Sequence, residues 1–241
     1  MASTFPRRVD NVSDIMAVDV NRAYDALDYG WVEVSDTWAY ASATTITVPT
    51  NATTFYQKGD RVRLKQGGAY KYYYIVTVAA TLLTVTGGSD YTVANAAITD
   101  IAISRSFRPF GFPQRFSWTP TWTNLTVGNG TTTATFNVNE SAFYFNLLFT
   151  LGSTSAVGTS PVFTPPITMG GSGLDVIGTV HMLGPGGVGY PGSAFLSTST
   201  AVGMFAHTVT GSTIRFSGIT ATVPFTWATD HRIHVAGRSR Y

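Results

Sequence analysis

The chain has 241 residues, of which 44% are hydrophobic and only 12% charged, and its formal net charge is +2. Globular domains carry about 25% charged residues, so this deficit indicates surface hidden in an assembly, although a Thr- and Ser-rich β-protein would share it. The absence of cysteine excludes disulfides and thiolate metal sites. No part of the chain is basic enough to indicate nucleic-acid binding.

Charge divides the chain into two parts. Residues 1–36 hold seven acids and three arginines, a net −4, whereas the other 205 residues hold 12 basic and 6 acidic side chains, a net +6. This contrast indicates two parts with different neighbours. The first residues show no apolar stretch of the signal-peptide type, and no run approaches 18 apolar residues. We therefore expect synthesis in a cytosol and no membrane insertion.

Residues 13–29 are predicted to form a helix. Ser13 suits the N-cap, and the apolar residues of the segment recur at intervals of four, three and four: Met16, Val20, Ala23 and Leu27. So short a stripe is marginal alone. It predicts an inter-subunit bundle or docking element in an anchor segment 1–36, and packing on the chain's own β-domain is the alternative.

Residues 37–104 are predicted to form a small β-barrel or sandwich, with strands at 44–48, 61–65, 70–78, 82–86 and 98–104. In the second strand the cations alternate with apolar residues and therefore lie on one face: Arg61, Arg63 and Lys65. We expect strand pairing across the Gly67-Gly68 turn to place Lys71 on the same face. This stripe is interpreted either as a solvated outer face or as a surface that binds anionic polymer or an acidic protein. The next strand contains four tyrosines, which are interpreted either as core or interface residues or as a platform on which sugars stack: Tyr70, Tyr72, Tyr73 and Tyr74.

Residues 105–118 form an apolar linker with four phenylalanines and two prolines. Such a segment is expected to pack between domains or against a neighbouring subunit. Residues 119–241 return to β-patterns and predict a sandwich of the jelly-roll type. Phe143, Phe145, Leu147, Phe149 and Leu151 take one face of a strand there, and further strands are expected at 134–138, 175–183, 194–198, 203–209, 213–217, 221–227 and 231–236.

No motif of the chain predicts catalysis, a cofactor or a metal. Gly184–Gly189 matches G-x-G-x-x-G, but it contains a proline and precedes no helix, so a surface loop is expected. A strand would place His231 and His234 on opposite faces, which excludes a shared metal. The C-terminal domain offers only Glu140, Asp175 and Asp230 as carboxylates for glycoside hydrolysis, and none are close in sequence.

Two stretches resemble bacteriophage tail proteins. A recurring phage and prophage tail module resembles the segment Trp118-Thr-Pro-Thr-Trp122-Thr-Asn-Leu125-Thr-Val-Gly128-Asn-Gly130 together with residues 151–157 and 161–163. The domain that precedes this module in such proteins resembles residues 59–65 and 83–91. The resemblance covers about residues 40–166. The family is that of tail fibres and minor tail proteins of the receptor-binding type.

The resemblance implies a non-enzymatic virion protein, often trimeric, that is attached to the tail by its N-terminus and faces the host with its distal β-domains. The partners expected are further copies of the chain, other tail or virion proteins and a host-surface glycan. A baseplate, minor tail or head-fibre component without a receptor is the alternative, and a polysaccharide depolymerase is a third reading. The family's receptor site does not transfer to this chain.

Overall fold

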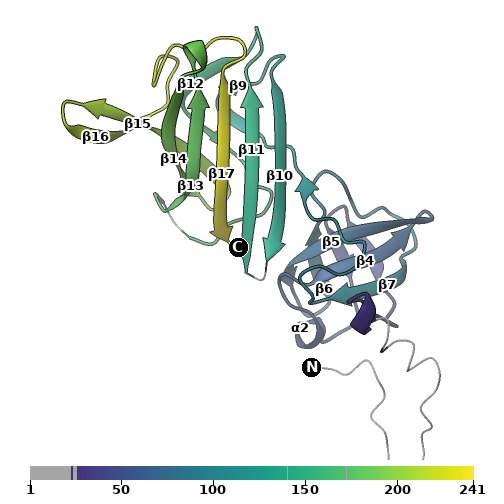
Figure 1. Ribbon diagram of the computed structural model, residues 1–241. Helices are drawn as coiled ribbons and strands as arrows, with labels where there is room; N and C mark the ends of the chain where they lie inside the picture. The colour runs from purple at the N-terminus through teal and green to yellow at the C-terminus, as the bar shows by residue number, and fades with distance from the viewer. Residues whose placement is uncertain (1–22, 24–25, 140, 172) are drawn as a thin grey trace, which may run out of the picture. The chain divides into compact units, whose positions relative to one another are not determined.

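The computed structural model describes residue 23 and residues 26–139, 141–171 and 173–241. They form two compact units that divide after Gln114 (Figure 1). Both units are built from antiparallel strands, which confirms the all-β fold class. Among the described residues, no helix is both long and apolar enough to cross a bilayer.

Unit 1, the part before Arg115, is a seven-stranded sheet with the order β1-β7-β4-β5-β6-β3-β2. Its strands are β1 (Val32–Glu33), β2 (Ala39–Ser42), β3 (Thr45–Thr47), β4 (Arg61–Gln66), β5 (Ala69–Val78), β6 (Leu82–Thr86) and β7 (Thr99–Ser104), and the short helix α2 (Ala52–Phe55) precedes β4. The inner face buries Val62, Leu64, Tyr73, Ile75 and Leu83 in one core. The five strands expected in this unit are present within a few residues of their predicted bounds.

Unit 2 is a ten-stranded sheet with the order β8-β10-β11-β17-β13-β14-β15-β12-β9, and β16 pairs with β15 alone among the described strands. Its strands are β8 (Phe116–Ser117), β9 (Trp122–Thr126), β10 (Thr131–Asn139), β11 (Ala142–Thr150), β12 (Ala156–Phe163), β13 (Val176–Leu183), β14 (Gly189–Thr198), β15 (Ala201–Thr210), β16 (Thr213–Gly218) and β17 (Arg232–Arg240). The ring centroids of Phe145 on β11 and Phe163 on β12 lie 6.1 Å apart, although four strands separate β11 and β12 in the sheet. The sheet therefore curls so that its two parts face each other across a core.

The alternation predicted for residues 143–151 is confirmed. Phe143, Phe145, Leu147, Phe149 and Leu151 are all buried. Pairing with β17 continues this inner face through Ile233 and Val235. The opposite, outer face of β11 carries Tyr144, Asn146, Leu148 and Thr150.

Three predicted boundaries differ from the structure. Residues 221–227 are not a strand, because Pro224 has no N–H to donate and Phe225 instead packs on Tyr190 at 4.8 Å. The boundary at residue 36 is also different, since β1 (Val32–Glu33) already pairs with β7. The 105–118 linker is divided between the units, because its end forms β8.

The Gly184–Gly189 motif forms the turn between β13 and β14 that was expected as a loop, with a 3-10 turn η1 (Pro185–Gly187).

The predicted helical seam is described only in part. Met16 and Val20 lie outside the described residues, whereas Ala23 and residues 26–28 are helical. Leu27 is 81% exposed and therefore makes little contact with the described chain.

Candidate functional site

The arginines of the basic stripe of unit 1 lie against aromatic rings of the same unit, whereas its Lys65 lies at the surface. The two-residue turn at Gly67 and Gly68, both with positive φ, pairs Gln66 with Ala69 and therefore Lys65 with Tyr70. Arg61, Arg63 and Lys65 consequently share their face with Tyr74, Tyr72 and Tyr70. Lys71 pairs with Leu64, so it lies on the opposite face, and its placement in the stripe was wrong. There Lys71 donates to the carbonyl oxygen of Thr92 at 2.6 Å.

Aromatic rings cover the arginines of this stripe. Arg61 is 4% exposed, and its guanidinium lies 5.4 Å from the Tyr74 ring centroid and 5.8 Å from that of Phe112. The guanidinium of Arg63 lies 5.1 Å from both Trp31 and Tyr70. Cation–π contacts of this kind stabilise a fold when they are shielded from water. Arg61 is therefore not a surface-binding residue, and we correct its assignment to the binding stripe.

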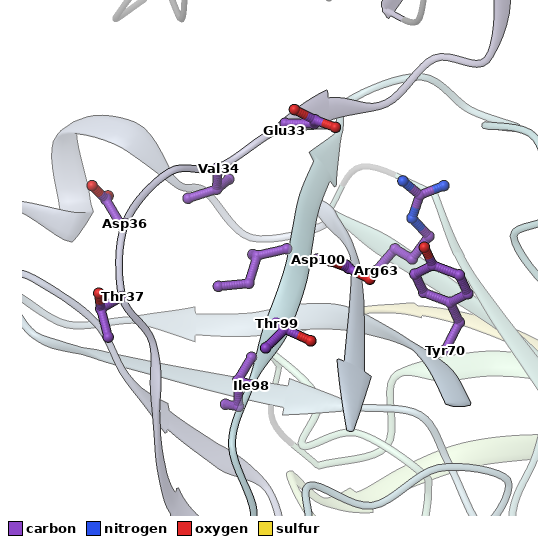
Figure 2. Close-up of a pocket in the computed structure, with 10 residues that line it drawn as sticks. Glu33, Val34, Asp36, Thr37, Arg63, Tyr70, Ile98, Thr99 and Asp100 are labelled. Atoms are coloured by element: carbon purple, nitrogen blue, oxygen red, sulfur yellow. The ribbon is translucent and has the colours of Figure 1, made fainter. Parts of the chain in front are cut away.

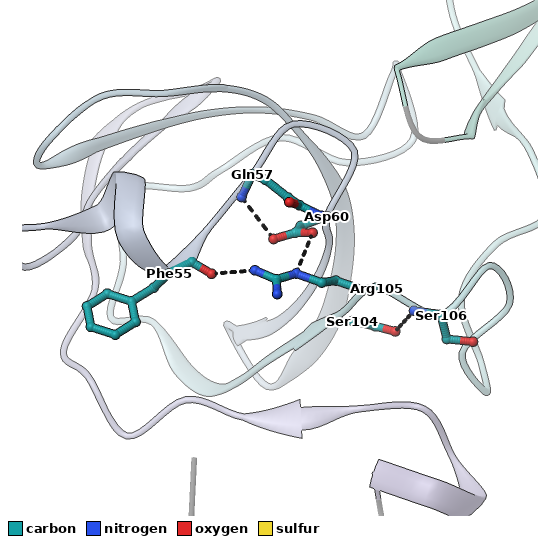
Figure 3. Close-up of polar contacts among 6 residues, drawn as sticks. All are labelled: Phe55, Gln57, Asp60, Ser104, Arg105 and Ser106. Carbon is teal, nitrogen blue, oxygen red and sulfur yellow. Dashed lines mark hydrogen bonds and ion pairs between the residues drawn. The ribbon is translucent and has the colours of Figure 1, made fainter. Parts of the chain in front are cut away.

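The cover comes from two segments that are distant in sequence. Trp31 donates from Nε1 to the carbonyl oxygen of Phe110 at 2.7 Å, and the backbone N–H of Phe110 donates to Tyr29. Arg105 begins the second segment, with Nε 3.3 Å from the buried carboxylate of Asp60 and a bond to the carbonyl oxygen of Phe55 (Figure 3). The apolar 105–113 stretch thus packs on its own unit.

A cavity of about 470 Å³ lies at the rim of unit 1 (Figure 2). Arg63 and Tyr70 lie on one side, and three acids also line it: Glu33, Asp36 and Asp100. Asp100 already pairs with Lys65 at 3.4 Å. Across the described residues, no three His, Asp or Glu side chains are grouped to hold a metal ion. The cavity therefore brings acids together without an arrangement that specifies a reaction.

The outer face of unit 2 offers a more extended polar surface. A groove of about 370 Å³ crosses β11, β17 and β13, and it is lined by Asn146, Leu148, His181, Leu183, Arg232 and His234. A second groove of about 220 Å³ lies on β10, β11 and β17 and shares Asn146 with the first; Arg115 and Asn137 also line it. We call the two together the Asn146 groove.

Strand register determines which side chains meet in this groove. Leu148 pairs with His234, and His234 pairs with His181, so the three side chains stand in one row across β11, β17 and β13. The side-chain amide nitrogen of Asn146 lies 2.9 Å from Nε2 of His234. The ring of His181 lies over Gly189, where an added Cβ would come within 2.5 Å of Nε2. Neighbouring strands therefore hold both imidazoles in place.

The charge along the groove has one sign. Arg115 and Arg232 contribute cations, and no Asp or Glu lines either part among the described residues. Arg238 stands level with Arg115 by strand register and lies 5.8 Å from the Tyr144 ring. Arg238 follows Arg232 by six positions along β17, which corresponds to about 20 Å. The surface is thus long, shallow and rich in hydrogen-bond donors.

The histidines outlined from the sequence are separated as expected. His234 points into the groove from β17, whereas His231 precedes the strand and accepts a hydrogen bond from the backbone N–H of Ala228 at 2.9 Å. His207 lies next to Ser193, with Nε2 2.8 Å from its hydroxyl. Only His231 and His234 were considered from the sequence as a joint metal pair, and the cross-strand pair of His181 and His234 was not anticipated.

The carboxylates considered for glycoside hydrolysis do not converge where the structure describes them. Asp175 precedes β13 and Asp230 precedes β17, and these strands are antiparallel neighbours. The two residues therefore lie at opposite ends of the sheet, about 20 Å or more apart, whereas a catalytic pair needs about 5–10 Å. Glu140 is outside the described residues.

The other part of the outer face is apolar and continues onto a projecting ribbon. Phe195 and Phe205 stack at 4.1 Å, and Phe205 is followed along β15 and β16 by Phe216, Ile214 and Val209. The last three are 62%, 66% and 73% exposed. In Figure 1 the β15–β16 ribbon extends beyond the rest of the sheet. We call this face of the ribbon the ribbon patch: Val209, Ile214 and Phe216.

The chain matches no protein-family model, no curated protein and no solved structure. Interpretation of its function therefore depends on the surfaces described above and on the resemblance seen in the sequence.

Proposed function

We propose that the chain is a homo-oligomeric structural protein of a bacteriophage particle, of the tail-fibre or receptor-binding type, and that unit 2 contacts a host-surface glycan. The observation that carries this proposal is the Asn146 groove. It is an open surface about 20 Å long that presents amide, imidazole and guanidinium donors beside two leucines. Such a surface suits an extended, hydroxyl-rich chain better than a small enclosed substrate.

The placement of the carboxylates that the structure describes in unit 2 is the reason for proposing binding ahead of cleavage. The two described carboxylates of unit 2 lie at opposite ends of its sheet. A depolymerase would need a pair beside the groove. We therefore place depolymerase activity behind binding.

Self-association is the second part of the proposal. An isolated two-stranded ribbon is marginal in water, and no second described strand pairs with β16 beside the ribbon patch. Another copy of the chain would cover this patch with an apolar contact. Such a contact agrees with the low charge content of the chain, which predicts surface hidden in an assembly. The other virion proteins would be bound through the N-terminal residues.

The experiment is to incubate fluorescently labelled full-length chain with a panel of bacterial strains. We expect binding that differs between strains and disappears after periodate oxidation of surface glycans, while protease treatment of the cells leaves it intact. Absence of binding to every strain would contradict the receptor-binding part. It would favour a structural baseplate, minor tail or head-fibre component, for which the ribbon patch is already a suitable contact surface.

A further inference from the structure

We infer that the ligand of the Asn146 groove is an anionic polysaccharide, whose carboxylate or phosphate groups lie against Arg115 and Arg232. This inference rests on the proposed glycan-binding function and adds the chemical class of the ligand. It follows from the charges that line the groove, from their spacing and from the residues between them.

Charge complementarity is the first argument. The lining holds two arginines and two histidines, and the described residues contribute no carboxylate to it. Unit 1 provides a contrast within the same chain, because its rim cavity is lined by three acids and one arginine that contacts aromatic rings. Arginines on a strand surface are commonly neutralised by facing acids; Arg115 and Arg232 form no ion pair with a described acid. An anionic ligand would supply that charge.

The spacing of the cations is the second argument. Arg115 stands at the level of Arg238 and Tyr144, and Arg232 lies at the far end of the same strand face. The two positions are offset by about 20 Å along the strands and by three strand spacings of about 4.8 Å across them, which matches a polymer that repeats its charge better than one small anion. Asn137 and Asn146 lie between them and can donate to and accept from sugar hydroxyls.

The leucines give the groove its third feature. Leu148 and Leu183 flank the histidine row, so they offer apolar contact for the C–H face of a sugar ring. A nucleic acid would need more phosphate contacts than two arginines provide, and the groove has no exposed aromatic row for base stacking. The lining therefore favours a charged glycan.

The test uses the full-length chain and three defined polymers. Polygalacturonate oligomers carry carboxylates, their methyl esters have the same backbone without charge, and glycerol-phosphate oligomers carry phosphates. Isothermal titration calorimetry should show binding of at least one charged polymer, at least tenfold tighter than the methyl ester. The charged polymer that binds better identifies the chemical source. The affinity should fall as salt is raised to about 1 M, where the Debye length is ~3 Å.

Variants localise the binding to the groove. Arg115→Gln and Arg232→Gln should each weaken binding of the charged polymer about tenfold, equivalent to about 1.4 kcal/mol. Arg215→Gln is the matched control, because Arg215 is an exposed arginine of the same unit that lies outside the groove. It stands on β16, and two strands, β14 and β15, lie between β16 and the groove strand β13. It should bind like the unaltered chain. Circular dichroism checks that each variant is folded.

Three results would overturn the inference: equal affinity for the ester and the charged polymers, no binding of either charged polymer, or unchanged affinity in both groove variants. The first and third do not depend on any loss of folding. If the labelled chain still bound glycans on cells in these cases, the proposed function would stand. The first two results would then contradict the anionic class, and the third would contradict the placement of the ligand at Arg115 and Arg232. If the chain bound no cells, the proposed function itself would fail.

Discussion

Two residues with the same formal charge on the same strand face have different roles, and burial separates them. Arg61 is enclosed by aromatic rings, whereas Lys65 pairs with Asp100 at the surface, with side chains 38% and 49% exposed. Alternation along the sequence placed both on one face correctly. It could not show that residues 105–112 return to cover one of them, since this depends on contacts between distant segments.

This difference predicts unequal effects on stability. Arg61→Ala should lower the free energy of unfolding by about 2 kcal/mol, because it removes shielded cation–π contacts. Lys65→Ala should lower it by about 0.5 kcal/mol, as is typical of exposed ion pairs. Urea denaturation of the two variants measures both quantities. Equal losses would show that Arg61 is no more enclosed than Lys65.

Asp60 predicts a pH dependence of stability. Burial raises the pKa of its carboxyl above the ordinary value of 3.8, although the backbone N–H of Gln57 and the charge of Arg105 oppose the shift. The folded state therefore holds the proton more tightly than the unfolded chain. Its contribution to stability is complete below pH 3.8 and is lost as pH rises through the raised pKa.

Asp60→Asn isolates this effect. Denaturation curves between about pH 3 and pH 7 should show the unaltered chain losing stability relative to the variant as pH rises. A difference that is constant over this range, or that changes in the opposite direction, would contradict the assignment.

At the scale of the elements, strands were predictable where one face is buried, and the groove was not. The run of residues 143–151 identified β11 and its inner face because buried and outward positions alternate. The same alternation identified Tyr144, Asn146 and Leu148 as outward. Their role emerges only because β17 (residues 232–240) lies beside β11 and β13 (residues 176–183) lies beside β17. Strand order is set by the whole sheet and cannot be read from one strand.

Local register was predictable in principle, and it explains the error at Lys71. A two-residue turn at Gly67-Gly68 fixes Leu64 opposite Lys71, and paired residues share a face. The residues 221–227 show the other kind of failure. They are rich in β-forming residues, but packing of Phe225 against Tyr190 and Trp227 outweighs that preference.

The aromatic cover of unit 1 makes a prediction about residues 107–112. Phe112 contacts Tyr74 at 5.0 Å and Tyr72 at 5.9 Å, whereas Phe110 is 72% exposed. Phe112→Ala should therefore destabilise the chain by about 2 kcal/mol, and Phe110→Ala by no more than about 0.5 kcal/mol. Thermal or urea unfolding of both variants measures the contrast. Similar losses would mean that the segment does not pack as described.

The β15–β16 ribbon predicts a change in association. Ile214→Asp places a charge in the ribbon patch and should lower the mass of the protein in solution, because an unpaired charge cannot be buried between copies. Thr213→Asp adds the same charge one residue earlier, on the opposite face of the ribbon, and should leave the mass unchanged. Light scattering behind size-exclusion chromatography measures both. An unaltered mass in Ile214→Asp would remove the ribbon patch from the interface.

At the scale of the whole molecule, three observations motivate the proposal of assembly. The chain is poor in charge, it has no disulfide to stabilise it, and it exposes apolar side chains on a projecting ribbon. The sequence predicted association from composition but assigned it to the Met16, Val20, Ala23 and Leu27 stripe. The ribbon patch was not anticipated, because residues 213–217 have the pattern of an ordinary strand. The sheet order is needed to show that β15 is the one described strand that pairs with β16.

The assembly claim is tested most directly by the mass of the full-length chain in solution. Sedimentation equilibrium at micromolar concentration should give a defined multiple of the 25.8 kDa chain mass, with three copies as the expected number. A single species of 25.8 kDa that remains folded on heating would contradict the account, because the exposed apolar surface would then need no second copy to cover it.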